Sequence, residues 1–272
     1  MKNIYSNIIK FNSKNLNKVI KTLKKNGIIS LPTETVYGLA GNAYSNISIK
    51  KIFKIKRRLK KNPLIIHYYS LKDAKKDVVL DQNFYKIYKK FSPGPITYIL
   101  KKKNNSRVKS LACANLNTIG IRFPENIIIK KILKKLNFPL AMPSANKSSG
   151  VSPVKPSDVS EEFNNKIKVI DGGTSKIGIE STVVNLVGVA SILRPGIITP
   201  KQLEKVLKIK IKIASKHKTI KSPGSLKKHY SPGLPIYLNR SRCPDKDAFI
   251  TFGAKYPVTR NSFNLSRKSN LN

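Results

Sequence analysis

The stretch Ile28-Ile29-Ser30-Leu31-Pro32-Thr33-Glu34-Thr35-Val36-Tyr37-Gly38-Leu39-Ala40 joins a short β-branched run to a polar loop. Pro32 has no N–H to give to a sheet, so a strand that begins near Ile28 ends there. Two hydroxyls, a carboxylate and a glycine follow, and they offer hydrogen bonds and close backbone approach with little bulk. The stretch predicts a strand edge that opens onto a binding loop. The alternative is an ordinary strand-to-helix turn in which a threonine caps the helix.

Apolar residues recur at helical and strand periods on both sides of this stretch. We expect helices over residues 15–26, 45–59, 81–91, 127–136, 156–163 and 199–206, and strands over 28–31, 64–68, 96–101, 118–123, 140–143, 168–170, 182–186 and 191–193. Gly27 is expected to cap the first helix, and Thr199 with Pro200 to begin the last. Because helices and strands alternate without a regular βαβ repeat, the pattern indicates an α/β fold with a mixed sheet.

Composition divides the chain into three parts. Residues 13–207 hold the alternating helices and strands and form the expected α/β domain. Residues 208–234 are rich in lysine and lose a clear period, which predicts a linker. Residues 235–272 form a short C-terminal part. Within it we expect strands over 235–238 and 248–252, and a disordered tail over 261–272.

The chain is strongly basic, with 54 Lys and Arg against 13 Asp and Glu and a formal net charge of +41. Such a charge normally indicates a polyanionic partner. Here the excess is nearly all lysine and accompanies abundant asparagine and isoleucine, three residues that share AT-rich codons. We therefore attribute it to a biased genome. Arginine is scarce, so its positions carry more information than those of lysine.

Cysteine usage and hydropathy indicate a soluble, unexported cytoplasmic protein. Cys113 and Cys243 lie far apart and have no metal-ligand spacing, so neither a zinc site nor a disulfide framework is expected. No apolar run approaches the roughly 18 residues that a membrane span needs. The N-terminus also lacks the uninterrupted apolar region of a signal peptide.

Short polar clusters occur where the predicted strands end, which is where α/β sheets place their sites. Their members are Thr33 to Thr35; Lys56, Arg58, Asn62 and His67; Thr118 and Arg122; Ser144 to Asn146; Glu180 to Thr182; and Arg194 to Gly196. Of the arginines in the first 200 residues, Arg57 and Arg107 alone lie outside these clusters. The pattern predicts a basic, hydroxyl-rich cleft for an anionic small molecule.

Each cluster also has a structural interpretation. Arg122 and Arg194 could serve in ion pairs, and His67 could be a core histidine bonded to backbone. Ser144 and Ser181 could cap a helix or a turn. No catalytic triad spacing and no Walker loop is present. The residues by themselves predict an anion-binding α/β cleft.

Seven motifs, in chain order, resemble those of the YrdC-like threonylcarbamoyl-AMP synthase family. They are Leu31-Pro32-Thr33-Glu34-Thr35-Val36-Tyr37-Gly38-Leu39, Lys56-Arg57-Arg58 with Asn62-Pro63-Leu64-Ile65-Ile66-His67, Ser92-Pro93-Gly94-Pro95-Ile96-Thr97, Ile121-Arg122-Phe123-Pro124, Pro143-Ser144-Ala145-Asn146-Lys147-Ser148-Ser149-Gly150, Gly178-Ile179-Glu180-Ser181-Thr182-Val183-Val184 and Leu193-Arg194-Pro195-Gly196. The resemblance covers residues 15–206. It implies a twisted mixed parallel and antiparallel sheet with flanking helices and a ligand cleft, formed by a catalytic domain over 13–207.

A further segment, Ser222-Pro223-Gly224-Ser225-Leu226-Lys227-Lys228-His229-Tyr230-Ser231-Pro232, resembles the linker of the longer, two-domain members. In those proteins a histidine-tyrosine segment folds over the nucleotide. The resemblance implies a linker and lid over 208–234. Residues 235–272 are too short for a full second domain, so we expect a truncated remnant there.

The family implies L-threonylcarbamoyladenylate synthase activity, which is a nucleotidyl transfer. Threonine and bicarbonate give N-carboxythreonine, whose carboxylate attacks the α-phosphorus of ATP. Pyrophosphate leaves, and threonylcarbamoyl-AMP passes to a transferase complex that modifies an adenosine of tRNA. Mg²⁺ is expected to bind mainly through the ATP phosphates, because Glu34 and Glu180 are the only carboxylates inside the motifs.

The resemblance also implies which residues form the site. Lys56 and Arg58 would serve catalysis. Threonine would be held by Thr35, His67, Arg122, the backbone at Met142 and Ser181. ATP would be held by Arg58, Asn62, Thr118, Ser144, Ser152, Arg194 and Tyr230. Leu59, Ser92 and Asn126 depart from residues common in the family, and none of these departures removes an implied ligand contact.

Two alternatives stay open at this point. One is a carbamoyl-transfer role like that of the YrdC-like module of hydrogenase-maturation proteins, whose acylphosphatase and zinc-finger segments are absent from this sequence. The other is an RNA-binding module without catalysis, or weak nonspecific RNA binding beside catalysis, which the charge of +41 would favour.

Overall fold

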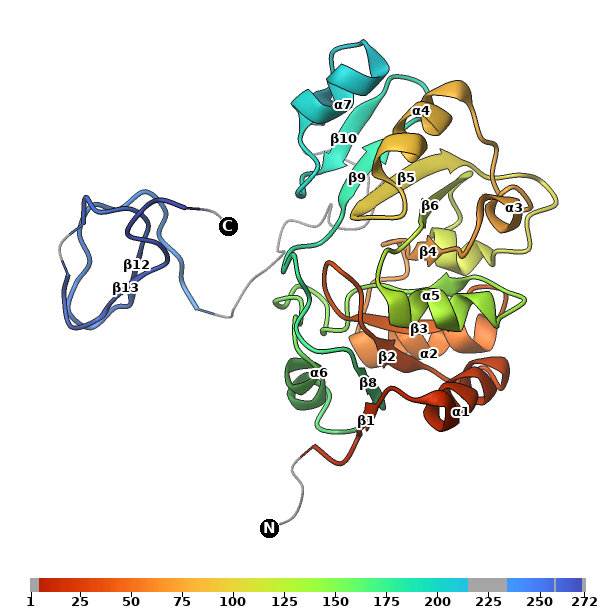
Figure 1. Ribbon diagram of the computed structural model, residues 1–272, viewed down its shortest axis with the longest axis horizontal. Helices are drawn as coiled ribbons and strands as arrows, with labels where there is room; N and C mark the ends of the chain where they lie inside the picture. The colour runs from red at the N-terminus through yellow and green to blue at the C-terminus, as the bar shows by residue number, and fades with distance from the viewer. Residues whose placement is uncertain (1–4, 215–233, 257, 271–272) are drawn as a thin grey trace. The chain divides into compact units, whose positions relative to one another are not determined.

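The computed structural model describes residues 5–214, 234–256 and 258–270 (Figure 1). Two compact units, Met1–Pro232 and Gly233–Asn272, divide the chain. The strands described in the first unit are β1 (Ile8–Lys10), β2 (Ile29–Leu31), β3 (Gly38–Asn42), β4 (Ile65–His67), β5 (Ile96–Lys101), β6 (Thr118–Arg122), β7 (Leu140–Ala141), β8 (Val169–Asp171), β9 (Thr182–Asn185), β10 (Ser191–Arg194) and β11 (Lys212–Ile213). Its helices are α1 (Ser13–Lys24), α2 (Asn46–Lys56), α3 (Leu71–Ala74), α4 (Gln82–Phe91), α5 (Ile127–Lys134), α6 (Pro156–Glu162) and α7 (Pro200–Leu207), with the 3-10 helix η1 (Ser110–Cys113).

The strands form one sheet in the order β1-β8-β2-β3-β7-β4-β6-β5-β9-β10-β11. Pairing runs in both directions, since β2 and β3 are antiparallel whereas β4 and β6 are parallel. The predicted α/β fold with a mixed sheet is confirmed. No helix in the described part of the chain is long and apolar enough to cross a membrane.

Side-chain caps begin the main helices where the sequence indicates. Ser45 Oγ accepts a hydrogen bond from Ser48 N at the start of α2, and Asp81 Oδ1 accepts one from Phe84 N at the start of α4. Thr199 caps α7, as predicted, and Pro200 follows as its first residue. Each cap satisfies an amide that the first helical turn would otherwise leave unbonded.

The end of α1 differs from the prediction. Asn26, not Gly27, takes the left-handed conformation, with φ of 57°. Gly27 N donates to Thr22 O at 2.9 Å, and a Cβ at Gly27 would lie 2.6 Å from Thr22 Cγ2. Glycine is therefore needed here for close packing rather than for its dihedral angles.

Three strands in the first unit, β1, β3 and β11, fall where we did not expect them. β1 lies before the predicted domain and pairs in parallel with β8. β3 follows the polar loop, and its sequence of small residues and a terminal asparagine shows no β-branched pattern. It is a strand because β2 and β7 pair with it on both sides. β11 lies inside the segment predicted as a linker and pairs in parallel with β10. In all three cases tertiary pairing decides the conformation, which local propensity does not reveal.

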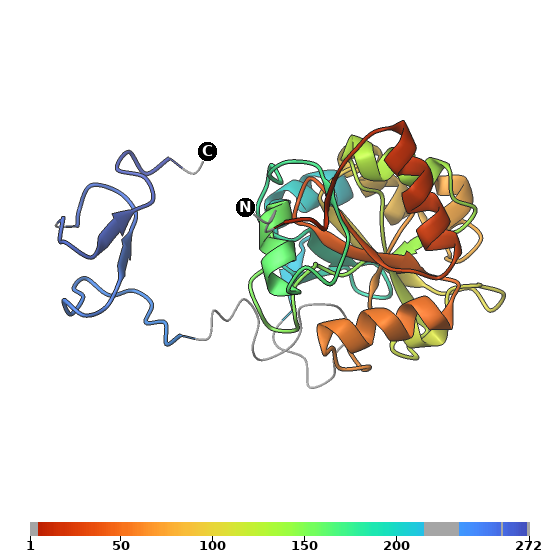
Figure 2. The same ribbon diagram turned by 90° about the horizontal axis from the view of Figure 1, so that it is seen from below.

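Helices cover the two faces of the sheet unequally. One apolar cluster joins Ile66, Tyr98 and Ile121 to residues of α2, α4 and α7. A second cluster joins Leu140 and Ile170, with other strand residues, to α1 and α5. Figure 2 shows α1 and α2 on opposite sides of the strands. Leu140 pairs with His67 of β4, so α1 and α5 cover the face on which His67 lies, over β2, β3, β7 and β8.

The rest of that face is polar. His67, Arg122 and Thr97 lie on it, along β4, β6 and β5. The apolar residues in the next row along the same face, Ile65 and Ile99, belong to neither apolar cluster. The fold thus leaves half of one sheet face available for polar side chains.

The second unit contains a parallel pair of strands, β12 (Phe249–Thr251) and β13 (Ser262–Asn264). β12 confirms the strand predicted at 248–252. Residues 235–238 form no strand, contrary to the prediction, and their apolar side chains are exposed. The disorder predicted for 261–272 is wrong at β13, because pairing with β12 and a bond from Asn264 Nδ2 to Gly253 O order this segment.

One buried carboxylate, Asp77, ties the segment after β5 to the rest of the first unit. Its oxygens accept bonds from the hydroxyls of Tyr44, Tyr68 and Ser106, at 2.6, 2.8 and 2.8 Å, and from Arg107 N at 2.9 Å. Asp77 is fully buried. Four donors on one buried carboxylate fix the positions of all the groups that bond to it.

Asp77→Asn should lower the free energy of unfolding by about 2 kcal/mol or more, because the amide would turn an N–H₂ toward groups that need an acceptor. Asp81→Asn is the matched control. Asn caps a helix as well as Asp does, so that change should stay within about 0.5 kcal/mol. Urea denaturation measures both, and equal losses would contradict the role given to Asp77.

Candidate functional site

The polar half of the sheet face centres on His67 and Arg122, which are register partners on the parallel strands β4 and β6. β5 pairs with β6 in the antiparallel direction, and Tyr98 is opposite Ile121. Thr97 of β5 is therefore opposite Arg122, on the side away from His67. Its hydroxyl contacts Ser181 Oγ at 2.8 Å. Four segments that are distant in sequence therefore bring their polar side chains to one place.

His67 is the most unusual residue of the site. Its side chain is 2% exposed, yet neither ring nitrogen has a hydrogen-bond partner. Burial lowers the pKa of the imidazole well below its usual range, and the nearby Arg122 charge lowers it further, so the ring is neutral at pH 7. A contact with the Ile65 backbone acts to raise the pKa, but no hydrogen bond to either ring nitrogen has ordinary geometry. A buried polar group without a protein partner can be satisfied by a ligand or by an ordered water.

Arg122 is held by Glu34 from the loop after β2. The Nη2 to Oε1 distance is 2.5 Å, and both side chains are buried. The second carboxylate oxygen accepts bonds from Glu125 N and Asn126 N, and Arg122 Nε donates to Gly94 O. Although burial acts to raise the pKa of the Glu34 carboxyl, the Arg122 charge and these bonds hold it below its ordinary value.

The threonines of the loop form a small network of their own. Thr33 Oγ1 donates to Val36 O at 2.6 Å and lies 2.8 Å from Thr35 Oγ1. A hydroxyl has one hydrogen, so Thr35 must be the donor in the contact between the two threonines. Thr35 Oγ1 then has only lone pairs left, which makes it an acceptor for a ligand. The alternative in which a threonine of this loop caps the helix is wrong, since Ser45 caps α2.

A second loop crosses the first one. Ile177 N donates to Glu34 O and Gly178 N to Thr35 O, both at 3.0 Å. The chain then continues to Glu180 and Ser181 just before β9. These two backbone bonds bring the motif that begins at Gly178 to the motif that contains Thr35.

Lys56 lies at the end of α2 and is 1% exposed. Its ammonium donates to Ser144 O at 2.5 Å and to Asn146 O, so it holds the loop that follows β7. Burial and the nearby Arg58 charge lower the pKa of the Lys56 ammonium to about 7. Asn146 Oδ1 and Ser148 Oγ, in the same loop, are buried without hydrogen-bond partners.

Arg58 is bound to its own loop. Nε donates to Asn62 O at 3.0 Å, and Nη2 donates to Asn62 Oδ1 and Pro63 O, both at 2.7 Å. Burial lowers the pKa of this guanidinium to about 10, against the attraction of the Glu180 carboxylate, so Arg58 is charged at pH 7. Asn62 therefore positions Arg58, as well as being a candidate ligand contact.

Arg194 at the end of β10 repeats the arrangement of Arg122. Nη1 pairs with Glu180 Oε2 at 2.6 Å, and Nε and Nη2 donate to Ser181 O. Nη2 also lies 3.1 Å from Ser181 Oγ. The ion-pair interpretation of Arg122 and Arg194 is therefore confirmed for both, and in each case the pair lies at the site rather than away from it.

The remaining predicted residues are placed as follows. Thr118 lies on the same face of β6 as Arg122 but four residues away, roughly 13 Å along the strand. Met142 N donates to Ile65 O, so only its carbonyl is left for a ligand. Ser144 bridges to Gly38, and Ser152 is buried. Tyr230 lies outside the described residues.

Sequence reasoning missed two contributions. Thr97 was not singled out, although it lies inside the motif that begins at Ser92, and its position beside Ser181 follows only from the pairing of β5 with β9. Glu34 was named only as one of the two carboxylates inside the motifs, and its partnership with Arg122 was not predicted. Among the described residues, no three His, Cys, Asp or Glu side chains gather as a metal site.

Comparison with known proteins identifies two matching family models. A family model for Sua5, YciO and YrdC proteins, described as telomere recombination, matches residues 21–196. A second, described as the C-terminal domain of threonylcarbamoyl-AMP synthase, matches residues 198–268.

Two curated relatives are named threonylcarbamoyl-AMP synthase. The protein from Pyrococcus abyssi is 36% identical over 79% of this chain, and the one from Bacillus subtilis is 34% identical over 79%. The chain spans 64% and 63% of their lengths. A crystal structure of Sua5 from P. abyssi with L-threonine is similar over 90% of this chain and 71% of that one, with a TM-score of 0.79 and 32% identity. The chain belongs to the YrdC-like threonylcarbamoyl-AMP synthase family.

Proposed function

We propose that the protein is an L-threonylcarbamoyladenylate synthase. It would convert L-threonine, bicarbonate and ATP into threonylcarbamoyl-AMP, pyrophosphate and water. The observation that carries the proposal is the neutral, fully buried His67 without a hydrogen-bond partner, beside Arg122 on the polar half of the sheet face. Family membership and the threonine complex of the P. abyssi protein support the same reaction.

The His67 end of the site fits a small zwitterion. Arg122 donates hydrogen bonds from Nη2 to Glu34 and from Nε to Gly94 O. Its remaining nitrogen, Nη1, would donate to the threonine carboxylate. Thr35 Oγ1 offers only lone pairs and would accept from the threonine nitrogen. His67, Ser181 and the Met142 carbonyl would complete the pocket. In this arrangement His67 acquires the partner that it lacks without a ligand.

The opposite end fits the nucleotide. Arg58 and Arg194 lie close to the Glu180 carboxylate, and Lys56 lies near both Glu180 and Glu162. The excess positive charge suits a triphosphate. The ATP contacts proposed here are Arg58, Asn62, Thr118, Ser144, Ser152, Arg194 and Tyr230. Thr118 lies roughly 13 Å from Arg122 along β6, a distance that a nucleotide can span.

The chemistry needs little covalent work from the protein. N-carboxythreonine would form from threonine and bicarbonate, and its carboxylate would attack the α-phosphorus while pyrophosphate leaves. The arginines and Lys56 would position the two reactants and neutralise charge on the phosphates. Glu34 and Glu180, each committed to an arginine, are poor metal ligands. Mg²⁺ would therefore be held mainly by phosphate oxygens and water, where it supplies further charge neutralisation.

The product is a reactive mixed anhydride, so it must reach its acceptor quickly. We infer that a threonylcarbamoyl transferase complex acting on tRNA takes it up in the cytoplasm. The activated carbamoyl carbon is open to attack by a nucleophile such as an amine, with AMP as the leaving group.

The test of the proposed function is pyrophosphate release from ATP and Mg²⁺. We expect release only when threonine and bicarbonate are both present. Threonine-independent release at the same rate would indicate ATP hydrolysis and overturn the proposal. Serine is a useful comparison, because it lacks the methyl group but keeps the ammonium, carboxylate and hydroxyl.

Arg58→Asn should lower kcat/KM for ATP by about a hundredfold, which is typical of removing one donor from a charged transition state. Arg57→Asn is the matched control. Arg57 has a left-handed φ of 49°, which asparagine tolerates, and its side chain is exposed. That variant should keep kcat/KM within about twofold. Equal losses of kcat/KM in the two variants would show that Arg58 is not the family's ATP-contacting arginine.

His67→Phe should weaken threonine binding at least tenfold, by removing a hydrogen-bonding ring. The same change should leave the free energy of unfolding without ligand equal or higher, because it removes two buried nitrogens that lack partners. Calorimetric titration measures the threonine affinity, and urea denaturation measures the free energy of unfolding. A loss of stability with unchanged threonine affinity would mean that His67 is structural.

A further inference from the structure

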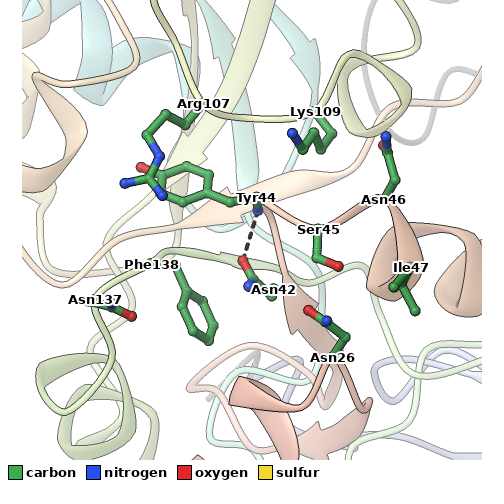
Figure 3. Close-up of a pocket in the computed structure, with 10 residues that line it drawn as sticks. All are labelled: Asn26, Asn42, Tyr44, Ser45, Asn46, Ile47, Arg107, Lys109, Asn137 and Phe138. Atoms are coloured by element: carbon green, nitrogen blue, oxygen red, sulfur yellow. Dashed lines mark hydrogen bonds between the residues drawn. The ribbon is translucent and has the colours of Figure 1, made fainter.

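Two adjoining hollows lie at the end of β3 and the start of α2, away from the proposed active site. β3 begins at Gly38 beside Ser144 and ends at Asn42 in the first hollow. α2 begins in this hollow and reaches Lys56 at its other end, about 15 Å away. The first hollow has a volume of about 540 Å³ and the second about 380 Å³. Figure 3 shows the first.

Arg107 is the main feature of the wall between the hollows. It is one of the two arginines in the first 200 residues that the proposed active site does not use. Its guanidinium lies 4.6 Å from the centre of the Tyr44 ring (Figure 3). Within the described part of the chain, Arg107 forms no ion pair. One face of this cation rests on an aromatic ring, and the side chain is otherwise exposed to solvent.

The stacked pair is firmly held from below. Tyr44 donates its hydroxyl to the buried Asp77 carboxylate, and Arg107 N donates to the same group. The four side-chain and backbone donors that bond the Asp77 carboxylate are all uncharged, so these bonds use none of the Arg107 guanidinium N–H groups. Because its backbone and its stacking partner share one anchor, the guanidinium is preorganised rather than freely mobile.

The other lining groups match a nucleotide. Lys109 adds a second cation, and no carboxylate lines either hollow. Phe138 adds an aromatic ring, and Asn26 and Asn42 add amides (Figure 3). Asn42 Oδ1 accepts from Tyr44 N, which leaves its amide nitrogen as a donor. Cations suit a phosphate, while a guanidinium plane and amides suit the face and edge of a base.

We propose that these hollows bind nucleotides, with the base stacked on the free face of Arg107 and the phosphate beside Lys109. The two hollows share Tyr44, Arg107 and Lys109, so they flank the same cation. Adjacent hollows around one stacking group suit two consecutive nucleotides of a single strand. A free mononucleotide and an unpaired RNA segment present the same chemistry, and the experiment below distinguishes them. The proposal does not rest on the synthase activity.

The test is a titration of the ¹⁵N-labelled full chain, followed by NMR at 150 mM salt. The probes are inorganic phosphate, uridine 5′-monophosphate and single-stranded tetrauridylate. We expect the amide signals of Tyr44, Ser45 and Lys109 to shift with the monophosphate and with the oligonucleotide. Each amide signal belongs to one residue, so binding in the ATP site shifts a different set of signals and is distinguished from binding in the hollows. Tighter binding of the tetranucleotide assigns the site to single-stranded RNA, whereas equal affinity assigns it to a free mononucleotide.

Variants make the test specific. Arg107→Ala should weaken binding about tenfold or more, and Arg107→Lys should recover only part of the loss because it keeps the charge but not the plane. Lys86→Ala, on the exposed side of α4, removes the same charge elsewhere and should change affinity less than twofold. Three results would overturn the proposal: no shifts at these amides, equal losses in Arg107→Ala and Lys86→Ala, or phosphate alone binding as tightly as the nucleotide.

Discussion

The buried ion pair between Glu34 and Arg122 joins the loop after β2 to the end of β6, and most of the site depends on this connection. Through Glu34 the loop also holds the segment before α5, and through its backbone it holds the loop that leads to β9. Removing one partner would leave a buried charge without compensation, which typically costs 3 to about 5 kcal/mol. The folded-state pKa of Glu34 is lowered, so this stabilisation is present above its ordinary pKa and is lost as the pH falls through the folded value.

A second buried pair, Glu180 with Arg194, repeats this arrangement at the nucleotide end. In both pairs the carboxylate orients an arginine and leaves part of the guanidinium directed to other groups. Lys56 completes the construction by holding the loop after β7 through two backbone carbonyls. The site is therefore built before any ligand arrives, which is how electrostatic positioning lowers a barrier without reorganisation. His67 is the contrast, since it is positioned but unsatisfied.

Much of this could be predicted from the sequence, and the exceptions have physical reasons. Periodicity located α2 and α4, periodicity with the Thr199 cap located α7, and the motifs located His67, Arg122 and Arg194. β3 was missed because strand pairing, not composition, makes it a strand. The partnership of Thr97 with Ser181 joins residues 84 positions apart and depends on β5 lying next to β9, which no local signal reveals. The same holds for Arg107, whose stacking on Tyr44 depends on a shared bond to Asp77.

The central claim is that the polar half of the sheet face around His67 is the threonine site. The chain has three histidines, so the ring ¹⁵N signals of His67 can be assigned by comparison with His67→Phe. The measurement that tests the claim most directly is the response of these signals to L-threonine at pH 7. We expect a neutral ring without ligand and a marked shift of one ring nitrogen on binding, as it gains a hydrogen bond. Unchanged His67 signals at a threonine concentration that saturates pyrophosphate release would contradict the claim.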